Sequence, residues 1–308
     1  SESDPAAAAL RPLAAEACGE LAFGDGREPS RTSGKIADLI AALGRLGPEW
    51  EALVFADSDL LVGPDWLAGL TAPLADPRVG VATAPMFYVP STRSLASFTG
   101  LAWFAAGLPW FSAMQNAAGQ SMAVRRADFD AWGMTERWSR VMLEDLPLAA
   151  AARAAGRRVE VVGSVLPWAP EDGGWTGLLS LTAKWMTLYK FYDARVWLLG
   201  LLLTLFKTYV WTRALAQGLW GLAAAAWAWD ALYLAMVVSG LERRLPDRFD
   251  RMPRACRPAA LWAALCAPLL QAVYAADFLR SAAARRIAWG RRVYRLSLGG
   301  AVEVLPRA

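Results

Sequence analysis

The second half of the chain is so apolar that a lipid bilayer has to be considered part of its folding environment. Residues 196–212 are interrupted only by Lys207, residues 214–241 contain only Asp230, and residues 258–276 carry no charge. A helix needs about 20 apolar residues to cross the hydrocarbon core of a bilayer. The second and third segments reach about that length and the first is marginal, so we expect two or three membrane helices between residues 196 and 279.

Charge divides the chain at the same place. Residues 1–195 hold 17 Lys and Arg against 22 Asp and Glu, whereas residues 196–308 hold 15 against 6. The arginines of the second half gather beside the apolar segments, in the loop 242–257 and after residue 284. This pattern favours the cytoplasmic side of a membrane, and anionic lipid rather than nucleic acid as the partner.

Together these features predict a multi-pass membrane protein with three regions. We expect a cytoplasmic catalytic domain at 1–195, a membrane region at 196–279 and a basic cytoplasmic tail at 280–308. Because both ends of the membrane region would face the cytoplasm, the number of crossings between them must be even. A hairpin of the first two segments is therefore favoured, with residues 258–276 interfacial or re-entrant.

The chain contains no histidine, and this excludes several kinds of active site. A Ser-His-Asp or Cys-His nucleophile, a histidine-ligated zinc ion and a histidine general base all require that side chain. Cys18, Cys256 and Cys266 follow no metal-binding or disulfide spacing and are expected to be packing residues. Acid–base or metal chemistry would have to use carboxylates, which favour hard cations such as Mg²⁺ or Mn²⁺.

The first 195 residues alternate between helical and strand patterns. A helix start is expected at Asp4-Pro5. Apolar runs that suit buried strands fall at 52–56, 79–84, 121–124 and 158–162, and helical patterns fall at 35–46 and 146–155. Strands separated by helices predict an α/β fold with a largely parallel sheet. In such sheets ligands bind beyond the carboxyl ends of the strands.

Asp57-Ser58-Asp59 directly follows the predicted strand 52–56. If the backbone stays extended, the two carboxylates lie on the same side of the chain. They could then share one divalent cation, leaving positions for phosphate oxygens and water, and the cation would neutralise a departing diphosphate. The alternative is a polar strand exit in which aspartate caps the next turn. The position at a strand end favours the metal site.

Glu144-Asp145 precedes the helical run 146–155 and has two interpretations. Aspartate followed by proline in the first turn of a helix is ordinary N-terminal capping. In the functional interpretation, Asp145 is a general base that deprotonates an acceptor hydroxyl as its oxygen attacks the anomeric carbon of a sugar.

Several other positions have both a structural and a functional interpretation. Lys35 is placed to pair with a donor phosphate, but it also opens a helix and lacks the full phosphate-loop pattern. Gly119 and Gln120 belong either to a close-approach turn beside a sugar pocket or to a plain loop. Lys184 and Trp185 stand near the boundary with the membrane region, where a tryptophan commonly anchors at the interface.

Taken in order, these motifs resemble the family-2 glycosyltransferases, and most closely the ceramide glucosyltransferase-like branch. The resemblance extends over nearly the whole chain. Its matching stretches are Asp4-Pro5-Ala6, Gly34-Lys35-Ile36 with Asp38-Leu39, Asp57-Ser58-Asp59 with Pro64-Asp65, Gly119-Gln120-Ser121-Met122 with Arg125-Arg126, Glu144-Asp145, and the tail from Ile287-Ala288-Trp289 through Tyr294-Arg295-Leu296 to Gly299-Gly300.

The resemblance implies a GT-A (Rossmann-like) domain with C-terminal transmembrane helices, and an inverting hexosyl transfer from a UDP-sugar to a lipid hydroxyl at the membrane face. Asp145 would be the catalytic base, and Asp57 and Asp59 would hold Mg²⁺ or Mn²⁺. The residues expected to bind the donor are Lys35, Asp57, Asp59, Gly119 and Gln120, and those expected near the acceptor or the diphosphate are Glu144, Lys184 and Trp185.

Two departures from the family pattern keep other functions open. Members normally begin with a transmembrane helix and a strand that helps hold the uracil, so we expect this chain to be N-terminally truncated. Where the family has (Gln/Arg)-x-x-Arg-Trp, the chain has Leu181-Thr182-Ala183-Lys184-Trp185. Lysine lacks the planar fork of arginine, which disfavours a processive polysaccharide synthase. The alternatives are transfer to a polyprenyl phosphate or a glycan, and a non-catalytic truncated membrane paralogue.

Overall fold

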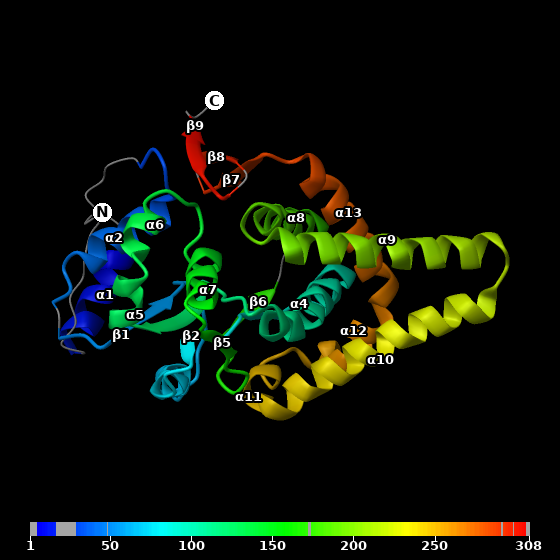
Figure 1. Ribbon diagram of the computed structural model, residues 1–308. Coiled ribbons are helices and arrows are strands. Elements are labelled where there is room, and N and C mark those ends of the chain that lie inside the picture. Colours follow the sequence, from blue (N-terminus) through cyan, green and yellow to red (C-terminus); the bar gives the residue numbers. More distant parts are fainter. Residues whose placement is uncertain are drawn as a thin grey trace.

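The computed structural model describes residues 5–16, 29–47, 49–171, 174–290, 292–297 and 299–305. Asp4 and Cys18, named above, lie outside these ranges. The described chain opens on α1 (Pro5–Glu16), where the sequence predicts a helix start. Figure 1 shows an α/β domain on the left, long helices on the right and the C-terminal strands at the top, between the two.

Among the described residues, the central sheet holds β1 (Ala52–Ala56), β4 (Ser121–Arg125), β2 (Val79–Thr83) and β5 (Arg158–Val161), in that order. The predicted strand positions are confirmed to within one residue. β2 and β5 pair in parallel, but β4 is antiparallel to both of its neighbours. The prediction of a largely parallel sheet is therefore wrong for β4, because the long helix before it returns the chain to the edge where β1 and β2 end.

Helices cover both faces of this sheet. One face packs against α2 (Gly34–Leu43), α5 (Arg126–Ala131), α6 (Met134–Trp138) and α7 (Asp145–Ala154), and the other against α3 (Trp66–Thr71), η1 (Ala72–Ala75) and α4 (Leu95–Met114). Alternation along β1 sends Leu53 and Phe55 into the first core and Val54 toward the second. The helix predicted at 35–46 ends early, at Leu43, because the N–H groups of Arg45 and Leu46 bond to carbonyls three residues back and form a turn.

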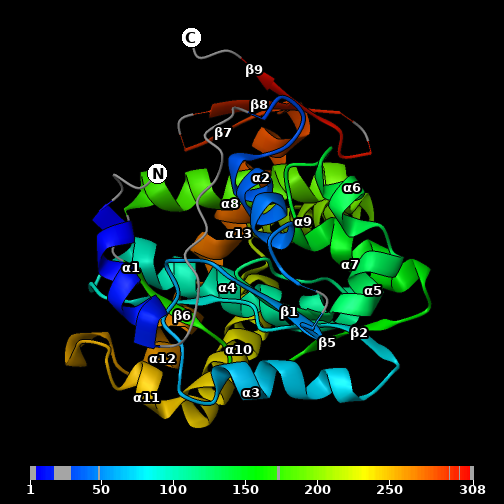
Figure 2. The same ribbon diagram turned by 90° about the vertical axis from the view of Figure 1, so that its left-hand side faces the viewer.

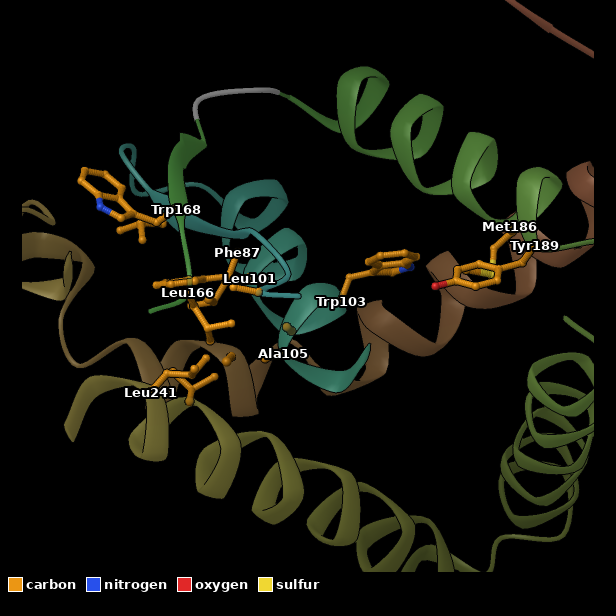
Figure 3. Close-up of a cluster of buried hydrophobic side chains, with 14 of the residues drawn as sticks. Phe87, Leu101, Trp103, Ala105, Leu166, Trp168, Met186, Tyr189 and Leu241 are labelled. Atoms are coloured by element: carbon orange, nitrogen blue, oxygen red, sulfur yellow. The ribbon is translucent and has the colours of Figure 1, made fainter. Parts of the chain in front are cut away.

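Helix α4 is the longest of several elements in the first half that the sequence patterns do not reveal. Its own side chains are apolar on almost every side of the helix, so it has no polar face and no amphipathic period. Its position explains this composition. One side packs against β3 (Phe87–Pro90), which pairs in parallel with β6 (Trp168–Glu171), and the other side contacts the apolar helices of the second half (Figure 3).

The second half forms α8 (Trp175–Tyr192), α9 (Ala194–Ala216), α10 (Trp220–Arg244), α12 (Ala259–Leu265) and α13 (Ala267–Ala283). In the described part of the chain, α9 and α10 are long and apolar enough to cross a membrane, and they project together beyond the rest of the molecule (Figure 1). Large side chains stand exposed on them, including Phe206 (64%) and Trp229 (75%).

The third apolar segment is not one straight helix. α12 and α13 are bent by 60° at a short break, which fits either a broken span or a re-entrant loop. The expected hairpin of α9 and α10 agrees with these lengths, while the direction and number of crossings stay predictions. The basic loop before α12 forms α11 (Pro246–Phe249) and η2 (Arg254–Cys256), and both Cys256 and Cys266 are free and buried, as packing residues would be.

The segment predicted as a basic tail folds back onto the molecule. β7 (Arg286–Trp289), β8 (Arg292–Leu296) and β9 (Val302–Leu305) form an antiparallel sheet near the ends of α2 and α8 (Figure 2). The Tyr192 hydroxyl donates to the Gly300 carbonyl (2.8 Å), and the backbone N–H of Val304 donates to the Ser30 carbonyl (3.2 Å). The C-terminal residues thus cover part of the α/β domain.

Trp138 joins the core under the sheet to the turn at Glu144, and its removal should destabilise the fold. The buried ring meets Phe55 (5.2 Å between centroids) and Phe129 (5.0 Å) edge-on, and its Nε1 donates to the Glu144 carbonyl (3.0 Å). We expect Trp138→Ala to cost about 3–5 kcal/mol through the cavity it leaves. Trp138→Phe, which mainly removes the hydrogen bond, should cost about 1–2 kcal/mol.

Thermal unfolding of the full chain in detergent micelles measures this effect. The unfolding temperature should fall from wild type to Trp138→Phe and further to Trp138→Ala. Trp50→Phe is the control, because Trp50 is 54% exposed and should tolerate the change. A Trp138→Ala protein that unfolds together with wild type would contradict the assigned role.

Candidate active site

The carboxyl end of β1 and the turn before β4 meet at one edge of the sheet. Ala56 lies opposite Ser121, and the ladder continues as the backbone N–H of Asp57 donates to the Gln120 carbonyl (3.0 Å). The chain then turns at Ser58 and Asp59, so the extended geometry considered for this motif is not what forms. Both aspartates nevertheless line the same cavity. The antiparallel direction of β4 is what brings Gln120 beside Asp57.

Lys35, in the first turn of α2, reaches two carboxylates across this edge. Its Nζ lies 2.5 Å from Glu144 Oε1 and also pairs with Asp57 Oδ1. Burial by itself lowers the pKa of Lys35, but the neighbouring Glu144 and Asp57 carboxylates outweigh it and hold this pKa above its usual value. Lys35 therefore remains a cation, and it links α2, β1 and the start of α7.

Asp145 is the first residue of α7, and its side chain points into the cavity instead of capping the helix. The capping position belongs to Glu144, whose side chain makes no capping hydrogen bond. Asp145 Oδ2 accepts from the backbone N–H of Gly119 (2.8 Å) and Oδ1 from that of Leu146 (2.7 Å). Burial, followed by the Glu144 charge, raises the pKa of Asp145 to about 7, against the opposing effects of both N–H groups and Lys35.

Glycine at position 119 is required by these carboxylates. A Cβ atom added to Gly119 would lie 2.9 Å from Glu144 Cδ and 3.2 Å from Asp145 Oδ2. The predicted close approach is therefore present, although the groups that approach Gly119 are protein carboxylates. Glu144 is itself buried, and its Oε2 has no hydrogen-bond partner among the described residues.

Helix α8 contributes Lys184 and Trp185 from the opposite wall. Burial lowers the pKa of Lys184, while Asp57 and Asp59 act against this shift. Its Nζ lies 5.0 Å from the ring centroid of Trp289 on β7. The indole Nε1 of Trp185 is buried without a hydrogen-bond partner in the described ranges.

These side chains surround one cavity of about 200 Å³. All nine residues singled out in the sequence line it, namely Lys35, Asp57, Asp59, Gly119, Gln120, Glu144, Asp145, Lys184 and Trp185. Residue patterns did not single out the remaining lining residues, which are Met86, Tyr88, Leu143, Leu146, Leu181, Leu188, Tyr189 and Trp289. Trp289 stood in a matched tail motif and Leu181 in the altered (Gln/Arg)-x-x-Arg-Trp signature, and these signals could have found them. The others are apolar or aromatic residues that look like core.

Asp57 and Asp59 are carboxylates of this cavity that could hold a divalent cation. Within the described ranges, no group of three or more His, Cys, Asp or Glu side chains could hold a metal ion. One oxygen of Asp57 is paired with Lys35, which leaves its other oxygen and Asp59. One Asp57 oxygen and the Asp59 carboxylate are too few ligands for a metal site made only of protein groups. They do fit Mg²⁺ or Mn²⁺ that also binds phosphate oxygens and water.

The chain matches one family of enzymes over almost its whole length. The model of glycosyl transferase family 21 matches residues 1–302, a range that includes every residue lining the cavity. No curated protein gives a significant match to the chain. This family is ceramide glucosyltransferase-like, so the resemblance drawn from the motifs is confirmed at that level. The protein is a glycosyltransferase and belongs to glycosyl transferase family 21.

Proposed function

We propose that the protein transfers one sugar from a UDP-sugar to a lipid hydroxyl at the membrane face, in the manner of a ceramide glucosyltransferase. The observation that carries this proposal is the buried Asp145 carboxylate, whose pKa is raised to about 7 and which shares a cavity with Asp57, Asp59 and Lys35. In a family 21 member, a base beside a charged pocket is what transfer to a hydroxyl requires.

Asp145 is assigned as the general base. The acceptor oxygen attacks the anomeric carbon and gives its proton to the Asp145 carboxylate, while the bond from that carbon to the diphosphate oxygen breaks and UDP leaves. A single displacement inverts the anomeric configuration. The N–H groups of Gly119 and Leu146 orient the carboxylate, and a pKa near the working pH suits a group that must accept a proton.

The donor is assigned to the opposite side of the cavity, in a domain of GT-A type. Asp57 and Asp59 would hold Mg²⁺ or Mn²⁺, which when bound neutralises the charge that develops on the departing diphosphate. Lys35 and Lys184 add positive charge to the same cavity, and we assign Lys184 to the diphosphate. Gly119 and Gln120 form the turn between the donor side and the base.

A lipid acceptor is supported by the position of the cavity. Its wall includes α8, and α8 packs against α9 and α13. The exposed apolar surfaces of α9 and α10 are typical of helices that face lipid. The arginines of the loop 242–257 favour the cytoplasmic side of the membrane for this loop and for the catalytic domain.

Replacing Asp59 by alanine should remove the metal-dependent part of donor binding. With UDP-glucose and MnCl₂ in calorimetric titrations, we expect the affinity to fall by about tenfold or more, and chelation of the metal should do the same to wild type. Asp130→Ala is the control, since Asp130 is an exposed carboxylate on α5 outside the cavity. Unchanged donor affinity in the Asp59 variant would remove the metal assignment.

Asp145→Asn should keep donor binding and lose transfer. The amide preserves size but cannot accept the proton of the acceptor, so kcat should fall by about 10²–10⁴-fold. Release of UDP in the presence of lipid acceptors measures turnover, with polyprenyl phosphate and oligosaccharide acceptors tested in parallel. Turnover within a few-fold of wild type would place the base elsewhere.

The pH profile of kcat/KM, which reports groups of the free enzyme, should reflect the raised pKa of Asp145. The carboxylate must be deprotonated to act as a base, so kcat/KM should fall as the pH drops through about 7 and level off above it. An ordinary surface aspartate would place this limb several pH units lower. A kcat/KM that stays flat from pH 8 to pH 5 would contradict the assignment.

A further inference from the structure

A second and larger cavity lies next to the polar one. It has a volume of about 650 Å³ and is lined mainly by α4, α8, α9, α10 and α13. Its wall is mostly apolar and includes Trp103, Leu203, Leu234, Leu270 and Phe278. Figure 3 shows Trp103 extending from α4 toward Met186 and Tyr189 on α8, and all three side chains belong to this wall.

The two cavities are adjacent and share four lining residues, which we call the neck, namely Met86, Gln120, Trp185 and Tyr189. Asp145 lies on the polar side of this neck, and the helices that can cross a membrane lie on the apolar side. A molecule that extends through the neck would therefore place its polar end beside Asp145 and its apolar end among α4, α9 and α10.

The neck also carries unused hydrogen-bonding capacity. Gln120 is buried (8% exposed), and its Oε1 has no partner among the described residues. The same is true of the buried Nε1 of Trp185. Leaving such groups unpaired costs free energy. An acceptor and a donor at one constriction suit a ligand group that both donates and accepts a hydrogen bond, such as a hydroxyl or a secondary amide.

We propose that the apolar cavity holds a hydrocarbon chain of the lipid acceptor, and that Gln120 and Trp185 hydrogen-bond to its polar head so that the reacting hydroxyl faces Asp145. This inference rests on the proposed function and adds the place and chemistry of acceptor recognition. It moves Gln120 from the expected donor side to the acceptor, as a positioning residue.

A hydrocarbon chain is the occupant that fits the rest of the structure. The cavity lies among helices whose outer surfaces are themselves apolar, and it shares four lining residues with a catalytic pocket that needs a hydroxyl. A nucleotide or an oligosaccharide would lose water at this wall without gaining hydrogen bonds in return.

Photolabelling tests the cavity without requiring turnover. The probe is an N-hexadecanoyl amino alcohol that carries a diazirine at the end of its acyl chain, bound to the full chain in detergent. We expect labelled peptides from α4, α9 and α10. Gly107→Leu should reduce this labelling at least about fivefold, because Gly107 lines the cavity and a Cβ there meets no described atom within 4 Å, so the new side chain fills open space.

Gly221→Leu is the matched control. Gly221 is also a helical glycine whose Cβ would meet no described atom within 4 Å, but it does not line the cavity. Labelling confined to other elements, or an equal loss in both variants, would overturn the inference. Labelling as expected in a protein that shows no transfer to any acceptor would overturn the proposed reaction and leave the lipid site standing.

Trp185→Phe tests the neck, since it removes the N–H and keeps an aromatic ring. The KM for the lipid acceptor should rise about tenfold, which corresponds to the loss of one hydrogen bond. The KM for the UDP-sugar and the unfolding temperature should stay unchanged. Trp262→Phe is the control, because Trp262 Nε1 is also buried without a described partner but lines neither cavity. An acceptor KM within about twofold of wild type, or an equal rise in both variants, would contradict the role of Trp185.

Discussion

The site depends on the burial of two adjacent carboxylates, Glu144 and Asp145, at the start of α7. Unpaired buried charge is strongly destabilising, so each carboxylate has to be compensated locally. Lys35 pairs with Glu144, and the backbone N–H groups of Gly119 and Leu146 bond to Asp145. These groups come from α2, from the turn before β4 and from α7. Their convergence on the two carboxylates defines one wall of the cavity.

Burial and the neighbouring Glu144 charge outweigh this compensation, and so the pKa of Asp145 differs from that of an ordinary aspartate. Glu144 is close enough to raise its pKa, and burial removes the water that would otherwise stabilise the charged form. The indole N–H of Trp138 donates to the Glu144 carbonyl and thereby fixes the turn at Glu144. Packing under the sheet and the protonation behaviour of the base are thus connected through a single turn.

Local signals in the sequence were enough to predict much of the fold and about half of the residues that line the cavity. Short-range patterns predict the strand end at residue 56, the strand end at 161 to within one residue, the helix that begins beside Lys35 and the acidic pair before α7. Other features depend on tertiary contacts. α4 is apolar all round because it packs between the sheet and the apolar helices, the direction of β4 is set by that preceding helix, and Trp289 reaches Lys184 only because the C-terminal strands fold back.

The cavity thus stands between two environments, with charged groups of the α/β domain on one side and apolar helices on the other. The central claim is that Asp145 serves as a base in a single displacement at this boundary. The most direct test is the anomeric configuration of the glycolipid product, read by NMR after reaction with an α-linked UDP-sugar. A β-linked product is the result that this account predicts, and an α-linked product would contradict it.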